Sequence, residues 1–145
     1  MADLVDLTVD ECLALLSRHT VGRLALTTRA GLRIFPLNYA LDHDDTIVFR
    51  TLPDGVIAAS ADGAEVAFEV DQVDEESHTG WSVEAVGRCE RMENPGDVRF
   101  MTARGDAVPW APGDRVLHFR IRWFDITGRQ VGIAGRPSLI PDRRS

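Results

Sequence analysis

The hydrophobic positions of this chain change from a helical to an alternating period near residue 20. Before that point, Thr8 and Glu11 have the three-residue spacing of a helix capping box, and apolar residues recur on one helical face through Arg18. After it, apolar and polar residues alternate in six segments, which is the period of strands with one buried face. These predicted strands are Val21–Thr28, Leu32–Leu41, Thr46–Thr51, Glu65–Val73, Gly80–Met92 and Arg115–Val131.

The segments between the strands carry turn and helix signals. The connections at 29–31 and 42–45 are short enough for hairpins, so we expect antiparallel pairing. Short helices are predicted at Val56–Ala61 and from Asn94 through about Arg104, and Gly87 is a candidate bulge. The pattern therefore predicts a mainly β chain with short helices, folded as a small barrel of about six antiparallel strands.

Pro36 stands inside the second predicted strand. Proline has no N–H to donate to a strand ladder. The position must therefore be an edge, a bulge or a gap that faces a ligand.

Length and composition favour one globular domain over residues 1–145, with a loose tail at 135–145. No apolar run approaches the roughly 20 residues of a membrane-spanning helix. Cys12 and Cys89 are too few for a disulfide framework and are expected to be small buried hydrophobes. These features predict a cytoplasmic protein with no membrane partner.

The net charge of −7 argues against a nucleic-acid partner. All 16 basic residues are Arg, and the segment 51–87 holds nine acidic residues and no basic one. An anionic ligand must therefore meet Arg from the first or last third of the chain, or backbone amides at a helix start.

Motifs for the commoner catalytic chemistries are absent. There is no phosphate-binding glycine loop, and the four histidines are too scattered for a metal site, although His118 in the last strand could face a pocket. No nearby base is available to activate Ser82. We therefore name no catalytic side chain or metal, and expect that in an enzyme a cofactor would supply the difficult chemistry.

Several sequence blocks, taken in order, resemble the pyridoxamine 5′-phosphate oxidase-like flavoproteins, in particular their short single-domain actinobacterial members. The blocks are GRLALTTRAGLRIFPLNYALDHDDTIVFRT, VAFEVDQVD, GWSVEAVGRCERM, PWAPG and ITGR, and the resemblance covers about residues 8–131. It implies a split β-barrel that forms a homodimer with two flavin sites at the interface. Most characterised members bind FMN, whereas others bind F420 or haem or have lost the cofactor.

The resemblance also implies a set of cofactor-binding residues. Arg50 and Thr51 match the strand that holds the FMN phosphate, and Pro36, Asn38 and Tyr39 match the strand along the isoalloxazine edge. The remaining positions are Trp81 and Ser82 near the interface and the flavin, a late Arg129, and Gly55 and Ile57 at the start of the following helix.

Ile57 takes the place of a lysine that relatives usually carry at that helix. A charge-assisted hydrogen bond contributes about 1.5–3 kcal/mol, so its loss would weaken FMN binding roughly 10- to 150-fold. With isoleucine at this position, the protein could bind flavin weakly or not at all.

Each of these positions also has a structural interpretation. The alternative role of Arg50 is an ion pair with Asp or Glu, that of Asn38 and Tyr39 is local hydrogen bonding, and that of Trp81 is packing in the core. Arg120, Arg122 and Arg129 alternate with apolar residues, so they either face solvent or serve an anionic cofactor of the neighbouring subunit.

The resulting hypothesis is an FMN-binding oxidoreductase with an unidentified small-molecule substrate. The alternative is a homodimer with weak or lost flavin binding, which takes F420, another ligand or no cofactor and acts as a non-enzymatic binding protein. A third, generic alternative is a β-barrel interaction module. Pyridoxamine-phosphate oxidase activity itself is not expected, because residues 130–145 lack the family's C-terminal substrate-binding Arg and His set.

Overall fold

The computed structural model of the chain describes residues 2–93 and 116–133, which form two helices and seven strands. The helices are α1 (Val9–Ser17) and α2 (Val56–Ser60). The strands are β1 (Ala2–Asp6), β2 (Val21–Thr28), β3 (Gly31–Leu41), β4 (Ile47–Thr51), β5 (Glu65–Asp74), β6 (Thr79–Arg91) and β7 (Leu117–Ile133). The helix predicted from Asn94 and the tail at 135–145 lie outside the described residues.

All six predicted strands are confirmed, and β1 is an additional one. Its side chains Leu4 and Val5 are adjacent and both exposed, at 59% and 53%, so this segment has no alternation to reveal a strand. Both predicted helices within the described residues are also confirmed. In α1, Thr8 Oγ1 accepts a hydrogen bond from the amide of Glu11, and Glu11 Oε1 accepts one from the amide of Thr8, at 3.1 and 2.9 Å.

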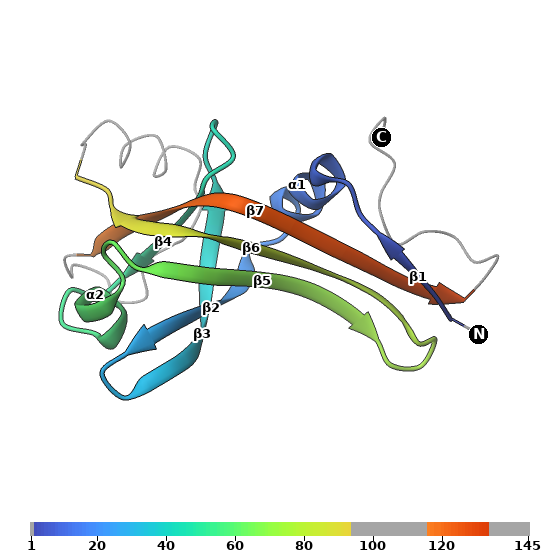
Figure 1. Cartoon of the computed structure of the whole chain (residues 1–145), viewed down its shortest axis with the longest axis horizontal. Helices are drawn as coiled ribbons and strands as arrows, with labels where there is room; N and C mark the ends of the chain where they lie inside the picture. The colour runs from blue at the N-terminus through green and yellow to red at the C-terminus, as the bar shows by residue number, and fades with distance from the viewer. Residues whose placement is uncertain (1, 94–115, 134–145) are drawn as a thin grey trace.

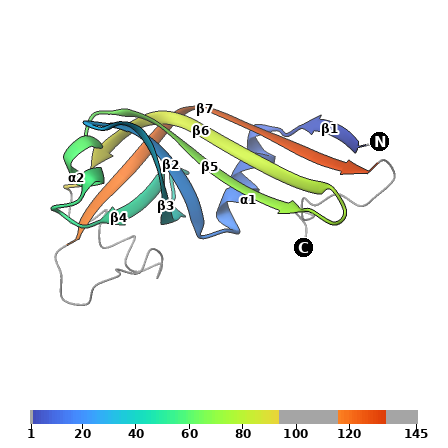
Figure 2. The same cartoon turned by 90° about the horizontal axis from the view of Figure 1, so that it is seen from below.

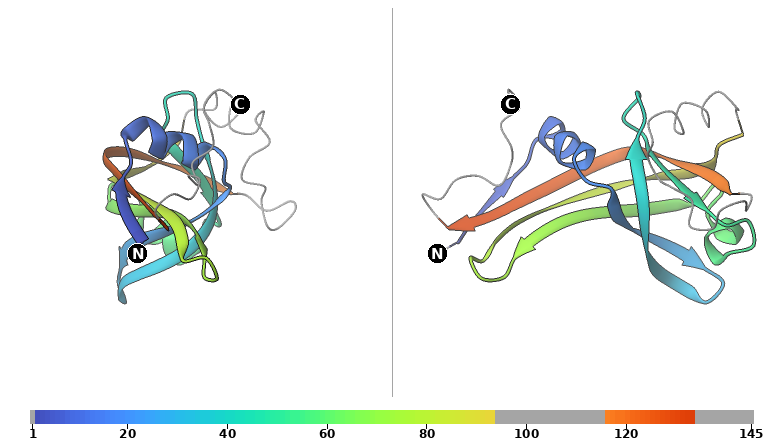
Figure 3. Two further views of the ribbon diagram at one scale, coloured as in Figure 1. Left: turned by 90° about the vertical axis from the view of Figure 1, so that its right-hand side faces the viewer. Right: turned by 180° about the vertical axis from the view of Figure 1, so that it is seen from behind.

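The strands close into a barrel through antiparallel pairs. The hydrogen-bonded order is β1-β7-β4-β3-β2-β5-β6, and β6 also pairs with β7. That last pairing joins β7, β4, β3, β2, β5 and β6 in a closed cycle, while β1 pairs with the far end of β7. The six-stranded barrel is therefore as predicted, and β1 is added outside the cycle (Figure 1; end view in Figure 3, left).

Strands β5, β6 and β7 extend well beyond the barrel (Figures 1 and 2). The first five residues of β7 pair with β4, and its last five pair with β1. A register shift between Val86 and Gly87 confirms the bulge expected at Gly87. The long strands thus carry one group of residues near the barrel and another at the opposite end.

Aromatic pairs lie at the centre of the barrel. The rings of Phe49 and Phe119 stack with centroids 5.6 Å apart, and Tyr39 meets Phe68 edge-on at 5.1 Å. Helix α1 adds Cys12, Leu15 and Leu16 to the same core.

Pro36 lies on an edge stretch of β3. Its backbone pairs with Arg23 of β2, whereas β4 pairs with β3 only at Tyr39–Leu41. The other side of β3 at Pro36 therefore has no strand neighbour among the described residues, and the missing N–H interrupts no ladder there.

Within the described ranges, none of the helices has the length and apolar character needed to cross a membrane.

Replacement of Gly87 by Ala should destabilise the fold. An added Cβ would meet the backbone carbonyl oxygen of Arg122 and would lie 2.5 Å from the Cα of Trp123, so neighbouring backbone must move. We expect a loss of about 1–3 kcal/mol in the free energy of unfolding, measured by urea denaturation. Gly132→Ala on β7 is the matched control because a Cβ there meets nothing within 4 Å. Equal stability of the two variants would contradict the bulge packing described here.

Candidate functional site

One face of the sheet places Arg50 of β4 beside His118 of β7. The two residues are direct partners in the antiparallel ladder, and the preceding pair, Phe49 and Phe119, is stacked in the core. Directly opposite residues project from the same side with Cβ atoms about 5 Å apart. Arg50 and His118 therefore share the face of the sheet that points away from the core.

The imidazole of His118 is neutral near pH 7. Burial lowers its pKa below the ordinary value, and the adjacent positive charge of Arg50 lowers it further. Its Nε2 atom is buried and makes no hydrogen bond within the described structure. The face thus offers a guanidinium and a buried imidazole nitrogen side by side.

The next cation along this face of β7 is bound to an acid. Arg120 Nε lies 3.2 Å from Glu90 Oε1, and Arg122 Nε lies 2.6 Å from the same oxygen. Glu90 raises the pKa of Arg122 through hydrogen bonding and charge attraction. Glu90 thus provides the negative charge that both Arg120 and Arg122 contact.

Strand β3 extends the same face. Pro36 and Asn38 alternate with Leu37 and Tyr39, whose side chains are buried in the core. Since the Tyr39–Phe49 pair faces inward, Pro36 and Asn38 project to the outer face, as Arg50 does. The structure therefore brings together three of the residues predicted for the cofactor.

Tyr39 belongs to the core rather than to the outer face that carries Arg50. Its side chain is 1% exposed, and its hydroxyl donates a hydrogen bond to the carbonyl of Leu16 at 2.5 Å. Burial raises the pKa of this phenol above its ordinary value. The surroundings of Tyr39 therefore support its structural alternative, a local hydrogen bond, over a contact with the cofactor.

Thr51, Gly55 and Ile57 lie at the end of the barrel next to Arg50. Thr51 pairs with Leu117, and by strand alternation its side chain leaves the face opposite to that of Arg50. Gly55 is the N-cap of α2, a helix of only five residues. Ile57 is 8% exposed and part of the core, so the position assigned to the missing lysine turns inward.

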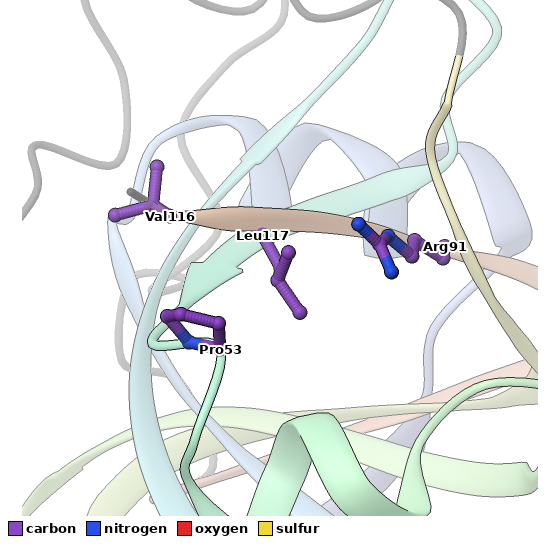
Figure 4. Close-up of a pocket in the computed structure, with 4 residues that line it drawn as sticks. All are labelled: Pro53, Arg91, Val116 and Leu117. Carbon is purple, nitrogen blue, oxygen red and sulfur yellow. The ribbon is translucent and has the colours of Figure 1, made fainter. Parts of the chain in front are cut away.

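A cavity of about 480 Å³ opens at this end of the barrel (Figure 4). Pro53 lines it from the loop before α2, Val116 and Leu117 from the start of β7, and Arg91 from the end of β6. In the close-up, the side chain of Leu117 is drawn between those of Pro53 and Arg91, and Arg91 supplies a cationic side chain.

Trp81, Ser82 and Arg129 form a second group on the extended part of the sheet. Ser82 of β6 and Arg129 of β7 are direct ladder partners. The three line another cavity of about 480 Å³, together with Leu4, Asp71, Val73, His78, Thr79, Gly80 and Val131. Trp81 is only 3% exposed, and its ring packs on that of His19 at 4.9 Å.

The two groups are separated within one chain. His118 and Arg129 are 11 residues apart on β7. At about 3.3 Å per residue, this spacing corresponds to roughly 36 Å along the strand. The Arg50 face and the group at Trp81, Ser82 and Arg129 therefore lie apart in one chain instead of lining a single pocket.

The two cysteine thiols and the acidic turn between β3 and β4 are weaker candidates for a catalytic or metal-binding role. Burial raises the thiol pKa of Cys12 to about 11 and of Cys89 to about 12, so both are neutral and unreactive near pH 7. Asp42, His43 and Asp44 bring their ligand atoms within 4.8 Å of one another in the β3–β4 turn. His43 and Asp44 are exposed there, and acidic turns of this kind are common without a metal.

The pairing of His118 with Arg50 is the feature that sequence reasoning did not identify. The alternation of residues 117–124 placed His118 opposite to the core-facing residues of its strand. Its neighbour across the ladder depends on the β4–β7 register, which joins segments 68 residues apart. No local signal contains that information.

Comparison with known proteins identifies a family. Residues 8–130 match the model of the family described as pyridoxamine 5′-phosphate oxidase. An uncharacterized protein of Mycobacterium tuberculosis is 34% identical over 101 residues, which cover 66% of this chain and 66% of that relative's length.

Two solved structures are similar over most of this chain. The FAD binding protein of Mycobacterium smegmatis has a TM-score of 0.75 and 28% identity, with 87% of this chain and 98% of that chain covered. A conserved protein of unknown function from Corynebacterium diphtheriae has a TM-score of 0.73 and 30% identity, with coverage of 87% and 96%.

Ile57→Lys should destabilise the protein and add no cation to the outer face that carries Arg50. Because Ile57 is 8% exposed, the change removes a buried side chain and brings a charge toward the core. We expect a loss of at least about 2 kcal/mol in the free energy of unfolding, measured by urea denaturation. The matched control is Val56→Lys, since Val56 is 55% exposed. A stable Ile57→Lys protein with tighter anion binding would instead place residue 57 at the ligand.

Proposed function

This chain belongs to the pyridoxamine 5′-phosphate oxidase family, and on that premise we propose that it binds a flavin, with FMN preferred, and acts as an oxidoreductase on a small-molecule substrate. The bound flavin would supply hydride or electron transfer. The side chains of this chain would bind the cofactor, orient it and exclude water. The similar FAD binding protein of Mycobacterium smegmatis supports a flavin as the cofactor class.

The observation that carries the proposal is the outer face of the sheet, where the Arg50 guanidinium lies beside the neutral imidazole of His118. A flavin phosphate brings nearly two negative charges and several strong acceptor oxygens. A guanidinium matches this group because it can donate two parallel hydrogen bonds. The buried Nε2 of His118 lies on the same face and makes no hydrogen bond among the described residues.

The rest of the β3 face suits the ring of the same cofactor. Asn38 follows Arg50 and His118 along this face, and its amide can donate to and accept from the polar rim of a flavin. Beyond it, Pro36, Ile34 and Leu32 project from the same side of the strand and are exposed, the latter two at 66% each. The face therefore changes from cationic to polar to apolar along its length, which complements the phosphate, the ribityl chain and the ring of FMN.

We propose further that the protein is a homodimer in which each flavin site combines the Arg50 face of one chain with the group at Trp81, Ser82 and Arg129 of the other. The group at Trp81, Ser82 and Arg129 lies too far along β7 to complete the Arg50 face of its own chain. A twofold dimer with antiparallel long strands would bring it to the Arg50 face of the partner and create two equivalent sites. Exposed Leu4 and Val73 beside the second cavity would then be covered.

One observation favours the alternative of weak or lost flavin binding. The segment 51–87 has no basic residue, and neither α2 nor its Gly55 cap offers a charged side chain. The phosphate would then depend on the Arg50 face alone. The protein would be a non-enzymatic dimer, or would take F420 or another anionic ligand. The absorption spectrum of the purified protein, before and after addition of FMN or F420, distinguishes these cases.

Arg50→Ala should weaken FMN binding roughly 10- to 150-fold, because one charge-assisted phosphate contact is lost. The dissociation constant is measured by quenching of flavin fluorescence. Riboflavin, which lacks the phosphate, should bind both proteins with the same affinity.

Arg29→Ala in the β2–β3 turn is the control for the loss of one positive charge, and it should bind FMN like the wild type. An unchanged FMN dissociation constant for Arg50→Ala would remove Arg50 from the phosphate site.

The composite site predicts complementation between two defective variants. Arg129→Ala should weaken FMN binding roughly tenfold or more by itself. When Arg50→Ala and Arg129→Ala proteins exchange protomers, each mixed dimer holds one site with both arginines and one site with neither. Random exchange should therefore restore wild-type affinity to about a quarter of all sites.

Titration of the mixture with FMN before and after exchange provides the measurement. Fluorescent labels of two colours, one on each variant, confirm that mixed dimers have formed. Formation of mixed dimers with no high-affinity fraction would show that Arg50 and Arg129 do not share a site across the interface.

A further inference from the structure

We propose that His118 is a second ligand of the anion held at Arg50, donating a hydrogen bond from Nε2, and that it takes up a proton when a phosphate dianion binds. The flavin affinity of this protein would therefore depend on pH through a histidine. The inference rests on the proposed function, since it names His118 as the partner of Arg50 in the phosphate subsite.

The geometry places His118 where such a ligand is needed. It faces Arg50 directly across the β4–β7 ladder, on the side of the sheet opposite to the Phe49–Phe119 pair. Its Nε2 atom is buried and makes no hydrogen bond within the described residues. Because nearly all buried polar atoms of folded proteins have a partner, an imidazole nitrogen in this state marks a place where a ligand atom fits.

The charged groups around His118 favour a neutral ring in the free protein. Strand β4 contributes Arg50, and β7 itself contributes Arg120 two residues further on. Strand β6 contributes Glu90, whose carboxylate contacts Arg120 and Arg122. Met92, which directly follows β6, donates a hydrogen bond from its amide to the carbonyl of His118 at 2.8 Å. Burial and Arg50 together lower the pKa of His118.

A bound phosphate dianion favours the protonated form of His118 instead. Two negative charges beside the ring favour the imidazolium, so the pKa of His118 rises in the complex. The contribution of this proton to affinity is fully present below the pKa of the free protein and is lost as pH rises through the pKa of the complex. For each unit by which the pKa rises, the affinity gains up to about tenfold.

The test compares FMN binding by the wild type and His118→Gln between pH 6 and pH 8.5. Glutamine keeps a donor but cannot titrate, so the ratio of the two dissociation constants isolates the histidine. The phosphate titrates with a second pKa of about 6 in both experiments and largely cancels from the ratio. We expect the variant to bind nearly as well as the wild type at pH 8.5 and about tenfold more weakly at pH 6.

Two controls accompany the comparison. His43→Gln replaces an exposed histidine in the β3–β4 turn and should reproduce the wild-type pH profile. Riboflavin should show no difference between the wild type and His118→Gln at any pH.

A second measurement needs no variant and remains valid if His118→Gln does not fold. The pKa of His118 is followed by NMR of its ring protons in the wild-type protein, with and without FMN. We expect a pKa below about 6.5 in the free protein and a higher value in the FMN complex, with no such change on addition of riboflavin.

The possible outcomes distinguish a failure of the His118 role from a failure of the proposed function. FMN binding can depend on Arg50 while the ratio of the wild-type and His118→Gln dissociation constants stays constant with pH and FMN leaves the His118 pKa unchanged. That result overturns the role of His118 but not the proposed function. Absence of FMN binding by the wild type at every pH overturns the proposed function, and the role of His118 with it.

Discussion

The pairing of β4 with β7 is the constraint on which the rest of this structure depends. It joins segments far apart in the chain and completes the closed cycle of six strands. On one side of the ladder it stacks Phe49 on Phe119 in the core, and on the other it sets Arg50 beside His118. A slip of one residue in one strand would exchange its faces and turn a guanidinium or an imidazole toward the core. The register that stabilises the barrel therefore also assembles the outer face that carries Arg50 and His118.

The long strands have a second consequence, which is that one chain holds its candidate ligand residues at two distant places. The Arg50 face lies at the start of β7, and the group at Trp81, Ser82 and Arg129 lies near its end. The acidic segment 51–87 contributes no cation to either. A composite site between two copies would supply arginine from both ends of β7, which explains how a chain with a net charge of −7 would recognise an anion.

Much of the fold could be predicted because local patterns determine it. The capping box at Thr8 and Glu11, the alternation in six strands and the bulge at Gly87 are all properties of short segments, and each is confirmed. Strand β1 could not be predicted in this way. Its adjacent apolar residues Leu4 and Val5 are both exposed and have no periodicity.

The candidate site was less predictable because it depends on which face each residue occupies. The family resemblance identified Pro36, Asn38 and Arg50, and these do share one face. It also included Tyr39 and Ile57, which the structure buries in the core. The role of His118 required the register between β4 and β7, which no short segment contains.

The central claim is tested most directly by a crystal structure of the protein grown with FMN. We expect the phosphate to lie within hydrogen-bond distance of the Arg50 guanidinium and His118 Nε2, with the ring along β3. A phosphate bound elsewhere, with Arg50 turned to bulk solvent, would contradict it.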